Sequence, residues 1–255
     1  MHREHMVQNS QGSHIRLVAD IGNTRAKVAV FEGDQMVLLE SFADPTPELF
    51  NSPGLAVYQP RAAIISSVAG DASAYMQMLP ECRWINLSHD TPLPFTIQYD
   101  TPETLGRDRI AGVAGAWHLF QGSDLLVIDA GTAITYDFIS KEGVYKGGAI
   151  SPGITIRFRA LNTFTSRLPL LNPAEISFLT GKTTDESILS GVMNGAKAEI
   201  DGIIEEYKAI YPELKIIITG GDMFYFEKKL KNNIFANSNL VIAGLKKILD
   251  YNLEK

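Results

Sequence analysis

Hydrophobic and polar positions alternate in a regular way near the start of the chain. An apolar run over 15–20 ends in an acidic residue, and the turn residues Gly22-Asn23 follow it. A Val-rich alternating run over 26–32, a turn at Gly33-Asp34 and a third run over 36–41 come next. Such alternation is typical of half-buried strands, and Gly, Asn and Asp favour tight turns. The pattern predicts a three-stranded meander.

The same pattern returns further along the chain. Apolar runs over 125–129, 133–140 and 144–150 are again separated by glycine-containing turns, and the first run again ends in an acid. When Asp129 is aligned with Asp20, the first turns coincide and the second turns nearly do. A repeat this long is not the period of a solenoid, so it indicates a duplicated domain.

The remaining segments predict helices and strands in mixed order. Their apolar periods indicate a strand at 62–68, a short helix that ends at Leu79 and a helix at 103–120. They also indicate a long helix at 185–210, a buried strand at 215–219 and a closing amphipathic helix at 240–252. The long helix carries Gly191, Gly195 and Gly202, which lower helix propensity. We expect these glycines to let another backbone approach closely.

A polar, glycine-containing stretch at 121–123 is the candidate boundary between the two halves. We therefore expect an N-terminal domain over 15–121 and a C-terminal domain over 122–255. The segment 1–14 is polar and lacks the apolar region of a signal peptide. It is interpreted as a disordered leader or tag remnant.

Composition narrows the function classes. The 255 residues are 45% hydrophobic and 20% charged, which suits a globular chain with a full core. The net charge of -6 argues against a nucleic-acid partner, because no broad basic field is available for phosphates. A single cysteine, Cys82, excludes an internal disulfide framework and a Cys-rich metal site. No run approaches the roughly 20 apolar residues of a membrane span, so we expect no membrane partner and a cytoplasmic location.

The two acidic turns are the first candidates for chemistry. A strand that ends in Asp20 or Asp129 and continues into glycine exposes backbone N–H groups, which can cradle phosphate oxygens. The carboxylate could hold a hydrated Mg2+ beside them, and Lys27 could add a positive charge. One such turn alone is more typical of an ordinary hairpin. Two related turns favour a pair that clamps one polyphosphate across a cleft.

The segment from Tyr99 to Arg109 is the second candidate. Pro102 favours a helix start, after which Arg107 and Arg109 flank Asp108. Flanking cations favour an ionised carboxylate, and such a carboxylate can accept the proton of an attacking hydroxyl. A solvated helix face with local ion pairs is the alternative interpretation of the same spacing.

Three glycine-rich turns complete the set, at 147–153, 181–184 and 219–222. The last follows a buried strand and could let the backbone lie flat against a nucleotide, or it could be a simple strand-end turn. Pro152 in the first predicts a helix that runs toward Leu161. Thr184 in the second could contact a ligand or simply cap the long helix.

In this order the motifs resemble type III pantothenate kinase, over roughly Ile15 to Leu249. Each motif alone is generic to the acetate/sugar kinase–Hsp70–actin superfamily, and the stretch from Thr104 to Arg109 is the specific one. The resemblance implies two ribonuclease H-like domains, each a mixed five-stranded sheet with helices, around a nucleotide cleft. It also implies ATP-dependent phosphorylation of pantothenate to 4'-phosphopantothenate, the first step of coenzyme A biosynthesis.

The resemblance also implies roles for particular residues. The ATP-binding positions are Asp20, Ile21, Gly22, Asn23, Thr24, Arg25, Ala26, Lys27 and Thr132. The pantothenate-binding positions are Tyr99, Gly106, Arg107, Asp108, Arg109 and Thr184, with Asp108 as the catalytic proton acceptor. Arg107 stands where the family often has a small residue, so it receives no separate role. Asp129 is the implied site of K+ or ammonium, Asp20 is a candidate Mg2+ ligand, and the expected assembly is a homodimer.

Two alternatives stay open at this point. The chain could phosphorylate another small hydroxy acid or a sugar, which a substrate panel would decide. It could also be a nucleotide-binding accessory factor of transcription without turnover, as relatives of this family have been described. The three acidic residues Asp20, Asp108 and Asp129 argue against an inactive enzyme, and the negative net charge argues against direct contact with DNA.

Overall fold

The chain has an α/β fold that divides into two compact units. The computed structural model describes residues 15–22, 25–67 and 71–255. The first unit comprises Met1–Pro94, Thr101–Ala114 and Val241–Lys255, and the second comprises Phe95–Asp100 and Gly115–Leu240. The leader predicted over 1–14 lies outside the described residues. Each unit is built on one mixed sheet.

The sheet of the first unit has the strand order β3-β2-β1-β4-β5. The three predicted strands of the first meander pair antiparallel, and the two later strands extend the sheet in parallel on the other side of β1. The strands are β1 (Ile15–Ile21), β2 (Arg25–Glu32), β3 (Gln35–Ala43), β4 (Ala62–Ser67) and β5 (Arg83–Asn86). The other elements are η2 (Pro47–Asn51), α1 (Ser73–Gln77), η3 (Pro102–Thr104), the start of α2 (Arg107–Leu119) and α5 (Leu240–Leu253).

One face of this sheet carries a hydrophobic core. Side chains from the sheet, such as Leu17, Val28 and Ile65, pack there. Phe50 of η2, between β3 and β4, and Tyr75 of α1, between β4 and β5, complete this core. Alternate positions of β1 and β2 point to this face, as the period of two along a strand requires. The core therefore fixes the register of β1, and with it the position of the acidic residue near its end.

Helix α5 groups with the first unit, although the sequence boundary placed it in the second half. Its Asp250 pairs with Arg16 of β1 and with Lys246, which is 2% exposed. Lys246 also lies 5.5 Å from the centre of the Phe31 ring. An amphipathic helix must bury its apolar stripe on some sheet, but its sequence does not say on which one. The part-buried ion pair to β1 and the contact of Lys246 with Phe31 of β2 support the grouping.

The sheet of the second unit has the order β11-β10-β7-β8-β9-β6. Strands β7, β8 and β9 pair antiparallel, whereas β10 and β11 continue in parallel beyond β7. The strands are β6 (Thr96–Ile97), β7 (Leu125–Ala130), β8 (Ala133–Ile139), β9 (Val144–Pro152), β10 (Lys215–Thr219) and β11 (Phe235–Ala236). The helices are α3 (Ile154–Thr163), α4 (Thr184–Ile210) and the short η4 (Met223–Tyr225).

The two sheets confirm the repeat predicted from the hydrophobic pattern. Read outward from the third meander strand, β9-β8-β7-β10-β11 has the same order and strand directions as β3-β2-β1-β4-β5. This is the arrangement expected for two ribonuclease H-like units. The second sheet differs from the expected five strands, because β6 adds a sixth on the edge at β9. A strand of two residues carries no alternation that a sequence could reveal.

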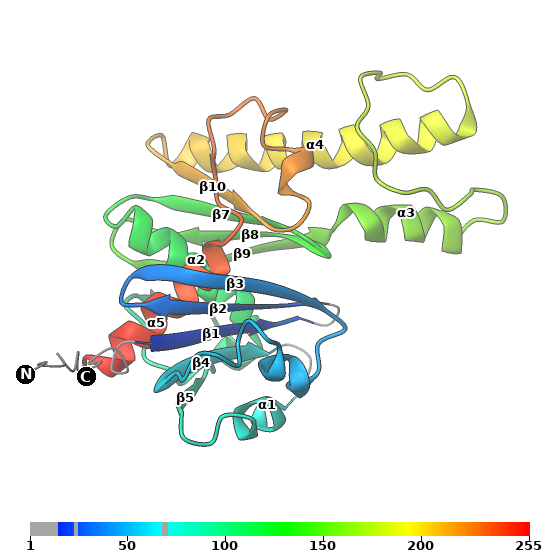
Figure 1. Ribbon diagram of the computed structural model, residues 1–255. Helices are drawn as coiled ribbons and strands as arrows, with labels where there is room; N and C mark the ends of the chain where they lie inside the picture. The colour runs from blue at the N-terminus through cyan, green and yellow to red at the C-terminus, as the bar shows by residue number, and fades with distance from the viewer. Residues whose placement is uncertain (1–14, 23–24, 68–70) are drawn as a thin grey trace, which may run out of the picture. The chain divides into compact units, whose positions relative to one another are not determined.

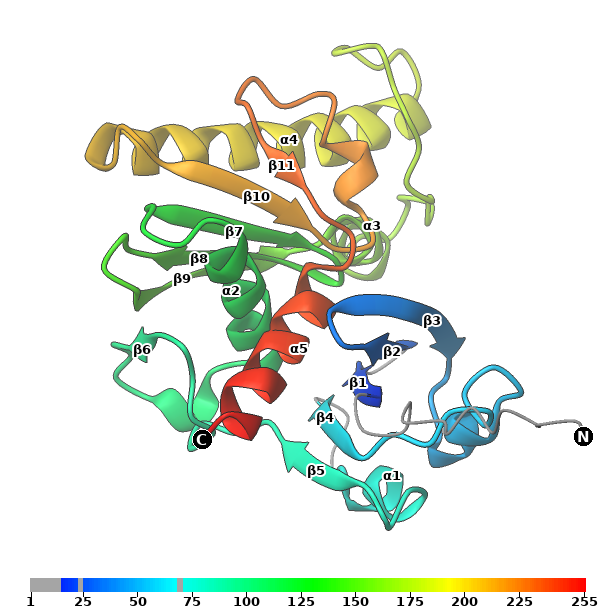
Figure 2. The same cartoon turned by 60° about the vertical axis from the view of Figure 1, so that its left-hand side comes forward.

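Helix α4 lies along one face of the second sheet, and α3 packs beside α4 (Figures 1 and 2). Its apolar stripe, which includes Ile188, Ala196 and Ile204, packs on β7, β8 and β10. With 27 residues, α4 is about 40 Å long at 1.5 Å per residue, longer than any strand beneath it. Figure 1 shows its N-terminal part extending past the ends of the strands, beside α3.

The glycines of α4 have no close neighbour from the rest of the described chain. A methyl group added at Gly191, Gly195 or Gly202 would have no neighbour within 4 Å outside the helix's own backbone, so no other segment of the described chain approaches these glycines.

Across the described ranges, no helix combines the length and apolar character that a membrane crossing requires.

Candidate functional site

Asp20 stands near the carboxyl end of β1, at the centre of the first sheet. Its register partner on the antiparallel strand β2 is Lys27, and its partner on the parallel strand β4 is Ser66. Cross-strand partners share one face of a sheet, so these three side chains are neighbours. The ends of parallel strands at a switch in strand direction are where open α/β sheets bind ligands. Asp20 therefore occupies the position that the fold favours for a site.

The environment of Asp20 disfavours its charge. Burial, followed by the negative charge of Asp108, raises the pKa of the Asp20 carboxyl from its usual 3.8 to about 6. The Ser66 hydroxyl and the Lys27 ammonium oppose this shift without cancelling it. Two acids that repel each other in a buried place are a common sign of a functional site. A cation beside Asp20 would relieve the repulsion.

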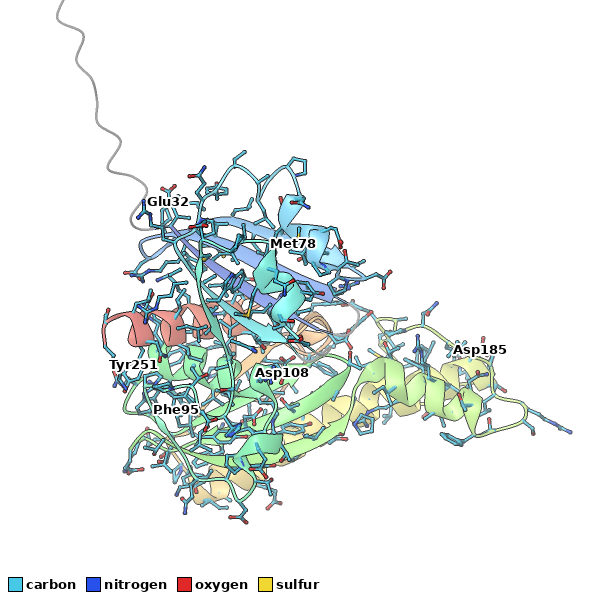
Figure 3. All side chains as sticks on the ribbon, turned by 90° about the horizontal axis from the view of Figure 1, so that it is seen from below. Glu32, Met78, Phe95, Asp108, Asp185 and Tyr251 are labelled. Atoms are coloured by element: carbon cyan, nitrogen blue, oxygen red, sulfur yellow. The ribbon has the colours of Figure 1, made fainter. Side chains whose placement is uncertain are left out.

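Asp108 lies in the first turn of α2 (Figure 3). Its Oδ1 accepts a hydrogen bond from the Arg109 backbone N–H at 2.9 Å, which fixes the direction of the carboxylate. A methyl group on Gly106 would come within 2.6 Å of the same oxygen, so glycine is required there for the close approach. The positive end of a helix favours an anion at this place. The predicted segment thus forms a compact acidic corner.

The two arginines of this segment behave differently. Arg107 donates from Nη1 to the Ser67 carbonyl at 2.9 Å, which ties the start of α2 to the end of β4. Arg109 is 8% exposed, and its side chain packs against Gly106. This hydrogen bond gives Arg107 a structural role, which the sequence did not predict.

The other predicted ATP-binding residues are spread over the β1–β2 turn. The Gly22 N–H donates to the Arg25 carbonyl at 2.9 Å, which closes the turn. Ile21 and Ala26 are buried in the core, so their contribution to a ligand would come from the backbone. Arg25 is exposed. Asn23 and Thr24 lie outside the described residues.

Asp129 occupies the equivalent place in the second sheet, at the end of β7. Its register partners are Thr135 on β8 and Thr219 on β10. Its surroundings are glycines: a methyl group on Gly220, whose φ is +94°, would lie 2.4 Å from Asp129 Oδ1 and 2.3 Å from the Ala130 carbonyl oxygen. Only glycine fits this left-handed backbone and this close approach. The turn at 219–222 is therefore part of the Asp129 site.

Thr132 lies in the exposed turn that follows Asp129. The turn is closed by the Gly131 N–H, which donates to the Ala133 carbonyl at 2.9 Å. The Gly153 N–H donates to the Thr132 carbonyl at 3.1 Å, and a methyl group on Gly153 would lie 2.1 Å from the Gly131 carbonyl oxygen. The glycine-rich segment 147–153 thus packs on the Asp129 turn.

Tyr99 belongs to the second unit, whereas Gly106 to Arg109 belong to the first. A methyl group on Gly147, whose φ is +96°, would lie 3.3 Å from the Tyr99 ring. The ring centroid lies 6.2 Å from that of Tyr145, whose hydroxyl donates to the buried Asp137 at 2.7 Å. Shared binding of pantothenate by Tyr99 and the Asp108 segment stays a prediction.

Thr184 is the first residue of α4 and is exposed. Capping of this helix is performed by the preceding residue: Thr183 Oγ1 accepts from the Glu186 N–H at 3.1 Å. The Glu186 carboxylate in turn accepts from the Lys182 N–H at 2.7 Å. The suggestion that Thr184 caps the helix was therefore wrong by one residue, since either threonine satisfied the sequence pattern. Its predicted contact with pantothenate stays a prediction.

Sequence reasoning missed Ser66. This residue is fully buried, yet it ends the apolar strand β4 with a hydroxyl beside Asp20. A polar Ser66-Ser67 pair after a buried run was a visible signal. The adjacency of β4 and β1 is a tertiary fact, however, so the sequence alone did not connect Ser66 with Asp20.

Residues of the site fit the expected cations in different ways. Among the described residues, no group of three or more His, Cys, Asp or Glu side chains could hold a metal ion. Mg2+ does not need such a group, because it is usually held by one or two carboxylates together with substrate phosphates. Asp20, with its disfavoured charge, fits that role. Asp129 Oδ1 and the Ala130 carbonyl, which lie against the same face of Gly220, offer oxygen ligands for a monovalent cation.

Solved structures place the fold in the class of sugar kinase and actin-like proteins built from two ribonuclease H-like domains. A glucokinase from an Antarctic psychrotroph has a TM-score of 0.54 at 12% identity, covering 93% of this chain and 99% of that one. A ROK family glucokinase from Streptomyces griseus, in complex with glucose and AMPPNP, has a TM-score of 0.53 at 11% identity, covering 94% and 100%. A Campylobacter jejuni protein described as a Baf family transcriptional activator has a TM-score of 0.61 at 22% identity, covering 94% and 100%.

Sequence relatives identify the family within this class. A type III pantothenate kinase from Phocaeicola vulgatus is 44% identical over 241 residues, which cover 93% of this chain and 99% of that protein. The type III pantothenate kinase of a Bacteroides fragilis strain is 45% identical over 243 residues, covering 93% and 98%. The sequence model of the type III pantothenate kinase family matches residues 16–206. The chain belongs to the type III pantothenate kinase family.

Proposed function

We propose that this protein transfers the γ-phosphoryl group of ATP to the hydroxyl group of pantothenate, which gives 4'-phosphopantothenate for coenzyme A biosynthesis. The family assignment supports the substrates. The observation that supports the chemistry is the carboxylate of Asp108, fixed at the start of α2 within electrostatic reach of Asp20. Because the reaction consumes ATP for a biosynthetic product, we place it in the cytoplasm.

In this proposal Asp108 is the proton acceptor. Its Oδ1 is held by the Arg109 N–H, so the carboxylate keeps one orientation while a substrate hydroxyl approaches. Phosphoryl transfer requires little covalent help from the protein, and its rate depends on position and on charge neutralisation. Asp108 orients the hydroxyl and takes its proton as the new P–O bond forms.

Asp20 and Lys27 serve the phosphates in this proposal. Lys27, the register partner of Asp20 on β2, supplies positive charge, and the β1–β2 turn is proposed to contact the phosphates through its backbone. Bound Mg2+ would neutralise the developing charge on the phosphoryl oxygens. Asp20 would hold this ion once ionised, because a cation offsets both its burial and its repulsion by Asp108.

Asp129 is proposed to hold K+ or ammonium, with Thr132 in the adjoining turn touching ATP. The glycine-lined position of Asp129 Oδ1 supports this role. Asp129→Asn removes the charge and keeps the shape. We expect it to raise the K+ concentration for half-maximal activity by at least about tenfold, because a single charge at contact distance is worth several kcal/mol at low effective dielectric. An unchanged K+ requirement would remove Asp129 from this role.

A coupled assay of ADP release tests the proposed function. The parent protein is assayed with ATP and pantothenate, with a panel of small hydroxy acids and sugars, and without any acceptor. The expected result is release that depends on pantothenate, lost by about 10²–10⁴-fold in Asp108→Asn. Glu103→Gln, an exposed acid in the preceding turn, is the matched control and should keep the parent rate. Release that ignores the acceptor would favour a nucleotide-binding factor.

We also propose that the protein is a homodimer. Apolar side chains around the N-terminal part of α4 are exposed, including Phe164 at 85% and Leu179 at 80%, and Gly191 and Gly195 leave open space beside the helix. Small residues at this spacing would let a second helix approach. Sedimentation equilibrium of the parent and of Gly195→Glu is the test. We expect a dimer that becomes a monomer in the variant, and a monomeric parent at micromolar concentration would contradict the proposal.

A further inference from the structure

Arg157 of α3 joins three acceptors in the second unit. Its Nη2 donates to Glu199 Oε2 at 2.5 Å and to Ser151 Oγ at 2.8 Å, and its Nε donates to the Pro152 carbonyl at 2.8 Å. Acceptors on β9 and α4 are thereby held by one planar guanidinium. Such a fork has a fixed geometry that lysine cannot reproduce.

Glu199 is the ionised centre of this group. Its other oxygen accepts from the hydroxyl of Tyr136, a fully buried side chain of β8, at 3.0 Å. Although burial pushes its pKa upward, hydrogen bonds from Ser151, Arg157 and Tyr136 hold the pKa of Glu199 below its ordinary value. Burial and the adjacent Glu199 charge raise the pKa of Tyr136, so its hydroxyl stays a donor. We name Tyr136, Ser151, Arg157 and Glu199 the arginine cluster.

The arginine cluster lies next to the turn that supports the Asp129 site. Arg157 Nε holds the Pro152 carbonyl, and the following residue, Gly153, donates its N–H to the Thr132 carbonyl at 3.1 Å. A methyl group on Gly153 would lie 2.1 Å from the Gly131 carbonyl oxygen and 2.4 Å from that of Thr132. The turns at 152–153 and 131–132 are therefore in tight backbone contact, and a shift of one moves the other.

The catalytic groups discussed above do not use this cluster. An ion pair between α3 and α4 could serve only to hold two helices together. The bond from Nε to the Pro152 carbonyl does not link the two helices, because its acceptor is the last residue of β9. It does set the position of the turn on which the Thr132 loop rests.

We propose that Arg157, oriented by Glu199 and Tyr136, is a positioning residue for nucleotide binding, which acts by fixing the Pro152–Gly153 turn against the Gly131–Thr132 turn. The inference rests on the proposed contact between Thr132 and ATP. Misplacement of a binding loop by about 1 Å can reduce catalysis by about 10²-fold. The affected substrate is ATP, because the turn carries Thr132, whereas the proposed proton acceptor Asp108 lies in the first unit.

Conservative variants test whether Arg157 positions the Pro152–Gly153 turn or only holds α3 and α4 together. Arg157→Lys keeps the charge facing Glu199 but loses the Nε bond to Pro152. Tyr136→Phe keeps the ring volume and removes one bond to Glu199. Arg159→Lys, at an exposed position two residues further along α3, is the matched control. The measurements are kcat, KM for each substrate, Kd of a non-hydrolysable ATP analogue by calorimetry, and Tm.

We expect Arg157→Lys to raise KM and Kd for the nucleotide by about tenfold, Tyr136→Phe to have a smaller effect, and KM for pantothenate to stay within about twofold. Arg159→Lys should match the parent. Nucleotide Kd and KM within about twofold of the parent in Arg157→Lys would overturn the inference, as would equal losses for both substrates that follow a lowered Tm.

The same experiment distinguishes this inference from the proposed function. A parent that binds the ATP analogue and phosphorylates pantothenate, with Arg157→Lys unchanged, refutes the positioning role alone. A parent that fails to bind the analogue refutes the ATP site and the positioning role together.

Discussion

The turns after β1 and β7 share one backbone arrangement and differ in the groups around the aspartate. Each follows a central strand whose last residue but one is aspartate, and each is closed by a glycine N–H that donates to a carbonyl at 2.9 Å. Around Asp20 are ionisable and hydroxyl groups, namely Asp108, Lys27 and Ser66. The register partners of Asp129 are the hydroxyl residues Thr135 and Thr219, and Gly220 packs against its Oδ1.

This difference shows how two copies of one backbone arrangement can surround the same residue type with different groups. In the first unit, the carboxylate is buried near a second acid, so its charge responds to ligands and to pH. In the second unit, Asp129 Oδ1 and the Ala130 carbonyl oxygen both lie against Gly220, which leaves no room for a side chain at that position. The repeat supplies the geometry of both sites, and the neighbouring residues supply their chemistry.

The largest expected effect concerns Asp20, beside the turn after β1. Asp20→Asn should lower kcat/KM for ATP by about 10²–10⁴-fold, because it removes the proposed Mg2+ ligand while keeping the side-chain shape. The same variant should unfold at a higher temperature at pH 7, since it removes a buried charge that Asp108 repels.

Steady-state kinetics and thermal unfolding check this pair of outcomes, with the exposed Asp90→Asn as control. An active Asp20→Asn enzyme, or one that is clearly less stable than the parent at pH 7, would contradict the account of Asp20.

The next effect tests the glycine turns of the second unit. Gly220→Ala should lower the free energy of unfolding by about 2–4 kcal/mol, because its methyl group would clash with the Ala130 carbonyl and Asp129 in a left-handed backbone. Gly221→Ala, which has nothing within 4 Å of the added methyl group, is the matched control and should change little. Denaturant unfolding measures both, and equal effects would refute the tight packing at Asp129.

The smallest effect concerns pH. Because the folded-state pKa of Asp20 lies above its usual value, the folded protein binds this proton more tightly than the unfolded chain. Stability from this residue is therefore present below about pH 4 and is lost as the pH rises to about 6, by up to about 3 kcal/mol.

Comparison of the parent with Asp20→Asn between pH 4 and 7, without nucleotide or Mg2+, isolates this contribution. The stability difference should grow in favour of the variant as the pH rises. A difference that is independent of pH would show that Asp20 titrates at its ordinary value.

Local patterns in the sequence predicted the local parts of the fold. Alternation and turn residues located both meanders, and the buried run at 215–219 coincides with β10. The long helix was predicted to begin at Asp185 and begins one residue earlier. These features depend on neighbouring residues, so a single sequence contains the information.

Features that depend on tertiary contacts could not be predicted in the same way. Strand β6 has two residues and pairs with β9 from a segment assigned to the other half. Helix α5 is amphipathic, but tertiary contacts such as the Asp250–Arg16 ion pair reveal its sheet. Ser66 lies beside Asp20 because β4 and β1 are neighbours, a pairing that the sequence does not state. The roles of the matched site residues came from the resemblance and stay predictions.

Product analysis tests the central claim most directly. The parent and Asp108→Asn are each incubated with ATP, Mg2+, K+ and pantothenate, and the products are separated and identified by mass spectrometry. The account predicts that 4'-phosphopantothenate and ADP form in equal amounts with the parent and are nearly absent with the variant. Phosphorylated pantothenate at the parent rate from a folded Asp108→Asn protein, or no phosphorylated pantothenate from the parent, would contradict it.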